Sequence, residues 1–291
     1  MANLAERLPE NVPGDFYVDR SCIDCDACRR IAPAVFEEGD RNSYVHAQPR
    51  TDEDRLRALM ALVACPTSSI GTRTRSDATP GARAFPERVD ENVFFCGFTS
   101  ERSFGAWSYF LERPGGNVLV DSPRAAGPLM NALEKRGGVA TMFLTHRDDV
   151  ADHAAFRKRF GCERVLHRDD VGPGTRDVER QLEGDEAVRL SDDLLAIPTP
   201  GHTRGHAVLL YRDRYLFTGD HLAWSRRRRA LVAFRDASWY SWPETIRSME
   251  RLLDHSFEWV LPGHGAWHRA ESPAQMRREL EACISWMKRV A

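Results

Sequence analysis

Four of the seven cysteines fall in the first quarter of the 291-residue chain, and their spacing constrains the fold more than any other feature. Cys22, Cys25 and Cys28 are separated by two residues each, and Cys65 follows later, next to Pro66. Three thiols at this spacing lie on one tight loop and can bind a metal group together, while the fourth arrives from a distant point of the chain. Such clustering points to metal or redox chemistry rather than to a disulfide framework.

Two metal groups compete for these four thiols. A structural zinc site normally shows two cysteine pairs, whereas here three cysteines precede one distant Cys-Pro. Three plus one is the ligation pattern of a [4Fe–4S] cluster, and since the chain has one triplet and one Cys-Pro, all four thiolates would serve a single cluster. We therefore predict that Cys22, Cys25, Cys28 and Cys65 bind a [4Fe–4S] cluster.

The sequence around these cysteines, SCIDCDACRRIAPAVFEEGD…ACPTSSI, resembles single-cluster ferredoxins across residues 15–71. The resemblance implies a small α+β domain whose role is either electron transfer or purely structural. Acidic residues beside the cysteines, among them Asp24 and Asp26, would form either a docking face for a redox partner or an ordinary solvated surface.

The remainder of the chain has a different pattern. From Asn92 onward, short apolar runs that end in turn residues alternate with segments of helical periodicity, which predicts a layered α/β domain. The segment between the two patterns is polar and lacks apolar periodicity. We expect a ferredoxin-like domain over residues 1–75, a linker over 76–91 and an α/β domain over 92–291.

Four of the apolar runs end in a turn that carries a metal-binding side chain. ATMFLT ends at His146, LLAIPTPG at His202, YLFTG at Asp220 and WVLPG at His264. If these runs are neighbouring strands, their ends lie along one sheet edge and the side chains can converge on one pocket. Four matches in order favour a metal site over four unrelated packed or surface residues.

The order of these motifs resembles the metallo-β-lactamase superfamily across residues 92–270. The matching signatures are Thr-His followed by Asp-His, then Pro-Gly-His-Thr-x-Gly-His, Thr-Gly-Asp and Leu-Pro-Gly-His-Gly. The resemblance implies an αββα sandwich with a binuclear metal site at one sheet edge, in which Asp220 and Asp152 carry the catalysis. It also implies six metal ligands: His146 and His202 for the first ion, Asp152, His153 and His264 for the second, and Asp220 as the bridge.

One position departs from the pattern of that superfamily. Its usual first motif is His-x-His-x-Asp-His, but here the second His is absent and two residues are added. Asp148 replaces that His if the loop is regular, because it lies two residues beyond His146 and points to the same side. Asp149 replaces it if the loop bulges. In a third alternative the first site is degraded and only one metal binds.

The substitution bears on the identity of the metal. An additional carboxylate makes a nitrogen and oxygen site harder and more anionic, which suits iron or manganese as well as zinc. The flavodiiron branch of the same superfamily also has a carboxylate at this position, although this chain lacks the Glu, the spacing and the flavodoxin-like domain of that branch. We expect two metal ions, with iron favoured and zinc or manganese as alternatives.

Three function classes remain. In a redox enzyme, the cluster supplies electrons to a di-iron site that acts on O2 or a small substrate, and an electron-donor protein or reductase is a partner. In a hydrolase, the metals lower the pKa of a bridging water that attacks an ester, thioester, lactone or phosphoester, and the cluster is structural or a sensor. Hydrolysis moves no electrons, so the cluster favours the redox class. The intact ligands argue against a scaffold with a dead site.

Composition excludes two kinds of partner. The net charge of −2 argues against bulk nucleic-acid binding. No stretch approaches the roughly 20 apolar residues that span a bilayer, so we expect no membrane partner. The first residues are too polar for a secretory signal, and we expect a cytoplasmic protein with a small-molecule substrate. The pattern does not predict an oligomeric state.

Overall fold

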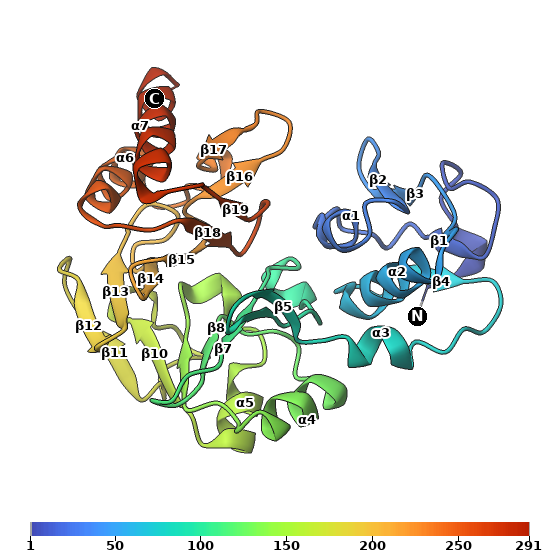
Figure 1. The fold of residues 1–291 in the computed structure, drawn as a ribbon, viewed down its shortest axis with the longest axis horizontal. Helices are drawn as coiled ribbons and strands as arrows, with labels where there is room; N and C mark the ends of the chain where they lie inside the picture. Colours follow the sequence, from blue (N-terminus) through green and yellow to red (C-terminus); the bar gives the residue numbers. More distant parts are fainter. Residues whose placement is uncertain (1, 291) are drawn as a thin grey trace. The chain divides into compact units, whose positions relative to one another are not determined.

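The computed structural model describes residues 2–290, and the chain forms two compact units. Unit 1 comprises Met1–Ala140 and Ala151–Cys162, and unit 2 comprises Thr141–Val150 and Glu163–Ala291. Figure 1 shows the elements of both units. Unit 1 therefore contains the cysteine-rich segment together with the first strands of the α/β segment.

The cysteine-rich part of unit 1 is a small α+β structure. Two antiparallel pairs of short strands, β1 with β4 and β2 with β3, accompany the helices α1 and α2. The cysteine triplet spans the loop before α1 and the helix itself, and Cys65 directly follows α2. The bounds are β1 (Phe16–Val18), α1 (Ala27–Ile31), β2 (Phe36–Glu38), β3 (Ser43–Val45), α2 (Asp52–Ala64) and β4 (Ile70–Thr72).

Both ends of α2 are fixed by hydrogen bonds. At the N-terminus, the Thr51 hydroxyl accepts from the Asp54 amide and the Asp54 carboxylate accepts from the Thr51 amide, which is a capping box. At the C-terminus, the Ala64 carbonyl accepts from the Thr99 amide at 3.2 Å and from the Thr99 hydroxyl at 2.8 Å. The Arg124 guanidinium donates to the Val63 carbonyl at 2.8 Å. These donors satisfy carbonyls that a helix end otherwise leaves without partners.

The rest of unit 1 is a set of four antiparallel strands with three helices. The strands pair in the order β5, β6, β7, β8, and all but β5 are fully buried along their length. Both α3 and β5 lie within residues 76–91. The bounds are α3 (Thr79–Arg83), β5 (Glu87–Asp90), β6 (Val93–Phe95), β7 (Tyr109–Leu111), β8 (Val118–Val120), α4 (Gly127–Lys135) and α5 (His153–Phe160).

Unit 2 contains three parallel strands and a second, mostly antiparallel sheet. The three parallel strands are β9 (Thr141–Phe143), β10 (Glu163–His167) and β11 (Arg180–Leu182). In the second sheet the strand order is β12-β13-β14-β15-β18-β19, and the β15–β18 pair is parallel. Its bounds are β12 (Val188–Ser191), β13 (Leu194–Pro198), β14 (Ala207–Tyr211), β15 (Tyr215–Gly219), β18 (Trp259–Pro262) and β19 (His268–Arg269).

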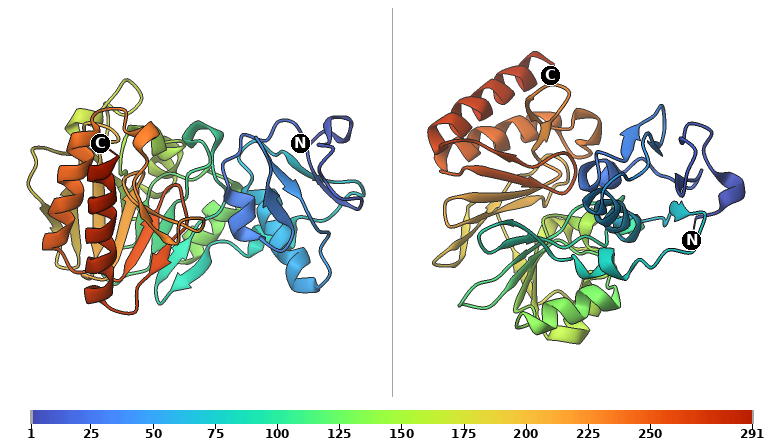
Figure 2. Two further views of the ribbon diagram at one scale, coloured as in Figure 1. Left: turned by 90° about the horizontal axis from the view of Figure 1, so that it is seen from above. Right: turned by 45° about the vertical axis from the view of Figure 1, so that its right-hand side comes forward.

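Two helices cover one face of this second sheet. They are α6 (Trp242–Arg251) and α7 (Pro273–Arg289), which lie side by side (Figures 1 and 2). Leu210, Leu216 and Val260 from the strands share one core with Met249 of α6 and with the buried stripe of α7. A hairpin of β16 (Ala223–Ser225) and β17 (Ala230–Val232) completes the unit and contacts α7.

The apolar runs and helical patterns beyond Asn92 fold as expected. The apolar runs form the strands β6 to β10, β13 to β15 and β18, and the segments of helical periodicity form the helices α4 to α7. The α/β fold class is therefore confirmed. The turn of four arginines at the tip of the β16–β17 hairpin, residues 226–229, is exposed to solvent, as runs of like charge usually are.

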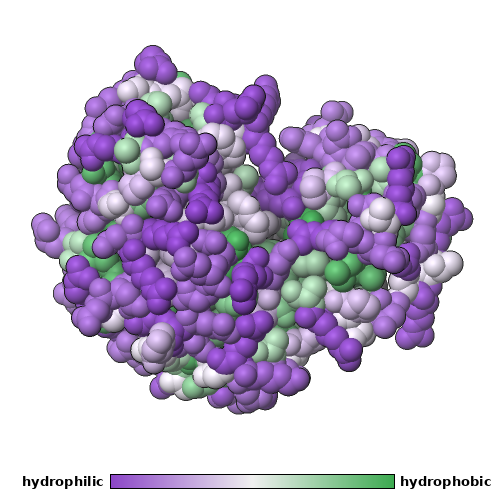
Figure 3. All heavy atoms as spheres, viewed as in Figure 1, coloured by the Kyte–Doolittle hydropathy of each residue, from purple (hydrophilic) through white to green (hydrophobic). Residues whose placement is uncertain are grey.

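The described residues show no sign of a membrane-spanning helix. Within residues 2–290, no helix is both long enough and apolar enough to cross a bilayer. The face drawn in Figure 3 is mostly hydrophilic, with small and scattered hydrophobic patches.

Candidate functional site

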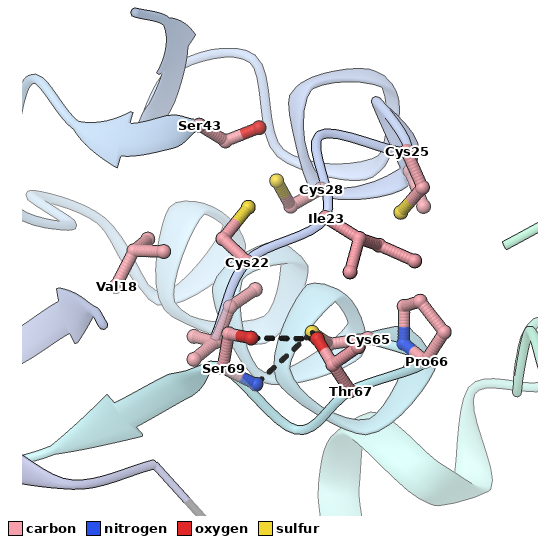
Figure 4. A pocket seen from close by; sticks show the side chains of 12 residues that line it. Val18, Cys22, Ile23, Cys25, Cys28, Ser43, Cys65, Pro66, Thr67 and Ser69 are labelled. Carbon is pink, nitrogen blue, oxygen red and sulfur yellow. Dashed lines mark hydrogen bonds between the residues drawn. The ribbon is translucent and has the colours of Figure 1, made fainter. Parts of the chain in front are cut away.

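The four cysteines of the N-terminal motif line one pocket. Figure 4 shows their side chains around a common space. The other residues that line the pocket are mostly apolar, including Val18, Ile23 and Ile70. None of the seven cysteines forms a disulfide, so no disulfide competes for these four. Four thiols around one apolar pocket fit the donor set of a [4Fe–4S] cluster.

Arginine side chains hold the cysteine loop in shape. Asp24 and Asp26 adopt left-handed backbone conformations, with φ of 59° and 66°, which let the chain wrap around the pocket between successive cysteines. Arg29 forms ion pairs with both carboxylates, and Arg30 pairs with Asp26. These two acids are therefore neutralised within the loop rather than displayed as an acidic docking face.

The pocket disfavours bare thiolates. Burial raises the pKa of Cys25 to about 12 and also raises the pKa values of Cys22 and Cys28. A bound cation reverses this effect, because metal ligation requires the deprotonated sulfur. The Ser69 amide already donates a hydrogen bond to the sulfur of Cys65 at 3.3 Å (Figure 4). Hydrogen bonds to the sulfurs are one of the means by which proteins tune cluster potentials.

A second cluster of chemically active side chains lies in unit 2. His146 follows β9, His202 follows β13, Asp220 follows β15 and His264 follows β18. The Oδ2 atom of Asp220 lies 3.9 Å from His146 Nε2, 3.7 Å from His202 Nε2 and 3.8 Å from His264 Nε2. The structure thus brings together the four residues that end the four apolar runs.

These separations are close to those of a metal site. Ligands bound about 2.1 Å from one ion lie about 3.0 to 3.5 Å apart at tetrahedral or octahedral angles. The Nε2 atoms of His146 and His202 and the Oδ1 atom of Asp220 are buried without a hydrogen-bond partner among the described residues. Two unpartnered imidazole nitrogens, each less than 4 Å from Oδ2 of the same carboxylate, fit a shared cation.

Asp148 and Asp149 each belong to a group of close ligand atoms that includes His146. The chain after His146 forms a single 3-10 turn, Arg147–Asp149, in which successive side chains point in directions about 120° apart. His146, Asp148 and His202 offer ligand atoms within 4.8 Å of one another, and so do His146, Asp149 and Asp220. Asp148 is half exposed, whereas Asp149 is buried. Both residues named as substitutes for the missing His therefore reach the cluster.

Gly263 makes room for two of these carboxylates. A Cβ atom at this position would lie 2.9 Å from Asp149 Oδ2 and 3.0 Å from Asp220 Oδ1. Any side chain there would push the carboxylate oxygens away. This close approach gives a physical reason for glycine in the Pro-Gly-His turn before His264.

Burial and charge act in opposite directions on the two innermost histidines. Burial lowers the pKa of His146 to about 4, although Asp220 counteracts it. Burial also lowers the pKa of His202, but the adjacent carboxylates of Asp148 and Asp220 outweigh it and raise the pKa above its usual value. The interaction with His202 lowers the pKa of Asp148. Asp148 is therefore anionic at neutral pH and attracts a cation.

Hydrogen bonds to the ring nitrogens that point away from the cluster orient the histidine rings. His202 Nδ1 donates to the Ala237 carbonyl at 2.5 Å, which leaves Nε2 as the atom that faces the cluster. His146 Nδ1 contacts the Thr145 hydroxyl at 2.9 Å. His206 uses both of its ring nitrogens, one with the Thr199 hydroxyl and one with the Asp220 amide. His206 therefore supports the cluster instead of offering it a ligand atom.

Asp152 and His153 lie in the other unit. Asp152 precedes α5, forms an ion pair with Arg102 and accepts a hydrogen bond from the Ala125 amide at 2.8 Å. His153 is buried at the start of α5. Neither residue belongs to the two groups of close ligand atoms described above. Their assignment to a second metal, and that of Asp152 to catalysis, stay predictions.

Comparison with known proteins identifies both halves of the sequence. The model of the metallo-β-lactamase superfamily matches residues 103–264, more than half of the chain. The chain belongs to the metallo-β-lactamase superfamily. A 4Fe-4S single cluster domain of the ferredoxin I type matches residues 18–72. The crystal structure of DIM-1 metallo-β-lactamase aligns with a TM-score of 0.54 at 16% identity, covering 70% of this chain and 97% of that one. The expected αββα fold with a ferredoxin-like N-terminal domain is confirmed.

Several curated relatives are hydroxyacylglutathione hydrolases. The hydroxyacylglutathione hydrolase of Rhizobium meliloti (strain 1021) is 32% identical over 134 residues, which cover 44% of this chain and 51% of the relative. That of Fuscovulum blasticum is 32% identical over 194 residues, covering 59% of this chain and 73% of the relative. The chain thus spans about half the length of the Rhizobium relative. The chain is a metallo-β-lactamase-fold protein with a 4Fe-4S domain.

Sequence reasoning missed several residues that build this site. Thr145, Thr199 and Ala237 hold the histidine rings, and Gly263 makes space for carboxylates. The two threonines adjoin strand ends that the apolar runs mark, so proximity to the motifs was an available signal. Nothing in the sequence pattern points to Ala237, because it contributes only a backbone carbonyl.

Proposed function

We propose that this chain is a redox metalloenzyme in which the 4Fe-4S domain supplies electrons to a carboxylate-rich binuclear site that holds iron. The observation that carries the proposal is the donor set in unit 2. Asp148, Asp149 and Asp220 contribute three carboxylates, beside the imidazoles of His146, His202 and His264. Such a set is harder and more anionic than one rich in imidazole, and it suits iron or manganese.

In this proposal the two adjacent aspartates serve different ions. Asp148 joins His146 and His202 on the first ion, since its Oδ2 lies 3.4 Å from His202 Nε2. Asp149 joins the Asp220 side, where its Oδ2 lies close to the same Gly263 position as Asp220 Oδ1. Asp149 then takes the place that family resemblance gives to Asp152, whose carboxylate is engaged by Arg102 and Ala125.

The cluster, when bound, provides electrons one at a time. In this proposal an electron-donor protein or reductase reduces it again. The protein contributes the apolar pocket and the four thiolates that hold it. The substrate is O2 or another small molecule, because the proposal needs an acceptor for those electrons. Hydrolysis alone would leave the cluster without a part in turnover.

A second candidate is hydrolysis of a thioester, favoured by the identity of about one third to hydroxyacylglutathione hydrolases. In that case the metal ions lower the pKa of a bound water, and the cluster is structural or a sensor. The same six side chains would hold the ions. The two candidates differ in which metal is bound and in whether the cluster takes part.

Metal analysis of anaerobically purified protein separates them. The redox proposal expects about six irons per chain, four in the cluster and two in unit 2, whereas about four irons with zinc supports the hydrolase. The Cys22→Ser variant should lose turnover with a reductant and O2 yet keep any hydrolysis of a hydroxyacylglutathione thioester. Reductant-driven turnover that survives the loss of the cluster contradicts the redox proposal.

The Asp148→His variant tests the argument from the carboxylate. It restores the imidazole that the superfamily pattern usually has and should shift the preference of the site toward zinc. Electron-coupled turnover should fall while the N-terminal cluster stays intact. If metal content and turnover are unchanged, Asp148 is not a ligand, and the case for iron loses its basis.

A further inference from the structure

Asp170 is a buried carboxylate that no motif singled out. It ends the 3-10 turn Arg168–Asp170 after β10 and is 1% exposed. Its Oδ2 accepts a hydrogen bond from the Thr203 hydroxyl at 2.5 Å and another from the Arg147 amide at 3.0 Å. Its Oδ1 accepts from the Gly205 amide at 2.8 Å. Hydrogen bonds to an ionised acceptor are among the stronger ones in proteins.

The three donors belong to the two loops that carry candidate metal ligands. Arg147 lies between His146 and Asp148, and Thr203 directly follows His202. One carboxylate therefore ties the loop after β9 to the loop after β13. The fit is close, because a Cβ atom on Gly205 would lie 2.6 Å from the Asp170 amide nitrogen. The glycine of the Pro-Gly-His-Thr-x-Gly-His motif thus lets the second loop reach Asp170.

We propose that Asp170 is a positioning residue of the metal site, fixing the spacing of the His146 and His202 loops so that their ligand atoms are arranged before the metal arrives. This inference rests on the proposed metal site. The ligand atoms concerned lie 3.4 to 3.9 Å apart, and they are held by short loops rather than by regular strands. Without Asp170 the two loops lose their shared anchor, and metal binding must order them.

Asp169 provides a matched control. It is the neighbouring aspartate on the same turn, its side chain is partly exposed, and it pairs with Arg204 of the same second loop. Surface ion pairs of this kind contribute little to stability. Replacing Asp169 therefore changes the charge and the sequence neighbourhood without removing the anchor between the loops.

The test uses the full chain with its cluster intact, after the metals in unit 2 have been removed by a chelator. Binding of Mn²⁺ to this protein is then measured by electron paramagnetic resonance. Asp170→Ala should weaken Mn²⁺ binding by about 10- to 100-fold, the usual cost of losing a residue that orients metal ligands. Asp170→Asn should weaken it less, since it keeps one acceptor oxygen. Asp169→Asn should bind Mn²⁺ as the unaltered protein does. Wild-type affinity in Asp170→Ala and Asp170→Asn overturns the inference.

Two further variants keep the result interpretable. If Asp170→Ala does not fold, Thr203→Val removes one of the three hydrogen bonds at nearly constant volume and should weaken Mn²⁺ binding about fivefold, the value of one net hydrogen bond; no change overturns the inference. His146→Ala tests the metal site itself. If it binds Mn²⁺ as well as the unaltered chain, the proposed site is wrong and the inference falls with it. If His146→Ala weakens Mn²⁺ binding but the Asp170 and Thr203 variants do not, the proposed metal site is supported and only the inference about Asp170 fails.

Discussion

The cysteine pocket and the histidine–aspartate cluster both gather metal-binding side chains, but they draw them from different parts of the fold. Three of the four cysteines lie on one loop and the start of one helix, so short-range spacing fixes most of that site. The second cluster takes its side chains from the ends of β9, β13, β15 and β18, which only the complete fold brings together. A site made locally is specified by its motif, whereas a distributed site is specified by loop geometry.

The two sites also differ in what they require of a metal. Burial raises the pKa values of Cys22, Cys25 and Cys28, so these three thiols keep their protons until a cation displaces them. The cluster in unit 2 already gathers three carboxylates around three imidazoles. Loss of metal therefore leaves protonated Cys22, Cys25 and Cys28 at one site, and at the other an Asp148 carboxylate whose pKa is lowered by its contact with His202. The following predictions test whether the two sites are independent in this way.

The largest effect is expected from Cys65→Ser, which removes the thiolate that directly follows α2. Most of the visible iron–sulfur absorbance and acid-labile sulfide should disappear, because three thiolates hold a cubane poorly. The N-terminal segment should also unfold more readily, since small metal-binding structures depend on their metal for stability. Cys283→Ala, at a buried thiol of α7, should keep the cluster. Unchanged absorbance in Cys65→Ser argues against the assignment of this ligand.

Asp220→Ala should empty the site in unit 2 and spare the cluster. Its carboxylate lies within 4 Å of three histidines, so its loss removes the negative charge between two cations. We expect activity below detection and loss of both ions, measured by elemental analysis, with unchanged iron–sulfur absorbance. Asp236→Ala, at an exposed position, is the control. A full metal complement in Asp220→Ala would show that the cluster has been misread.

Asp148→Ala and Asp149→Ala should each weaken the binding of one metal ion and leave the binding of the other unchanged. Mutation of a residue that only orients a metal ligand typically lowers metal affinity by about 10- to 100-fold. Loss of a ligand itself should therefore lower the affinity by more than about 100-fold. Competition with a chelator of known affinity measures this for each ion. If one of the two variants leaves the affinity for both ions unchanged, only the other aspartate is a ligand and the two-carboxylate arrangement is wrong.

The smallest of these effects is expected from Gly263→Ala. The added methyl group would lie about 3 Å from two carboxylate oxygens, which must move by a few tenths of an ångström. Metal affinity should fall about tenfold, at the lower end of the cost of disturbing ligand orientation. Gly172→Ala is the matched control, since a Cβ atom there has no heavy atom within 4 Å. Equal affinity in the two variants argues against crowding at Gly263.

Much of the fold was readable from the sequence, and some of the site was not. Buried strands such as β14 and β15 are continuous apolar runs, so their positions follow from pattern. By contrast, β5 has no fully buried residue and pairs only with β6, so its polar sequence looks like part of a linker. The choice between Asp148 and Asp149 depended on a 3-10 turn, which residue types alone do not predict.

The hydrogen bonds at the end of α2 have a consequence for dividing the chain into fragments. Thr99 and Arg124 bind the carbonyls just before Cys65, yet both lie outside the segment that matches a ferredoxin domain. A fragment that stops at the end of that segment would lack these donors. The cluster-binding segment is therefore expected to need the chain as far as Arg124 to keep this helix end as it is in the full chain.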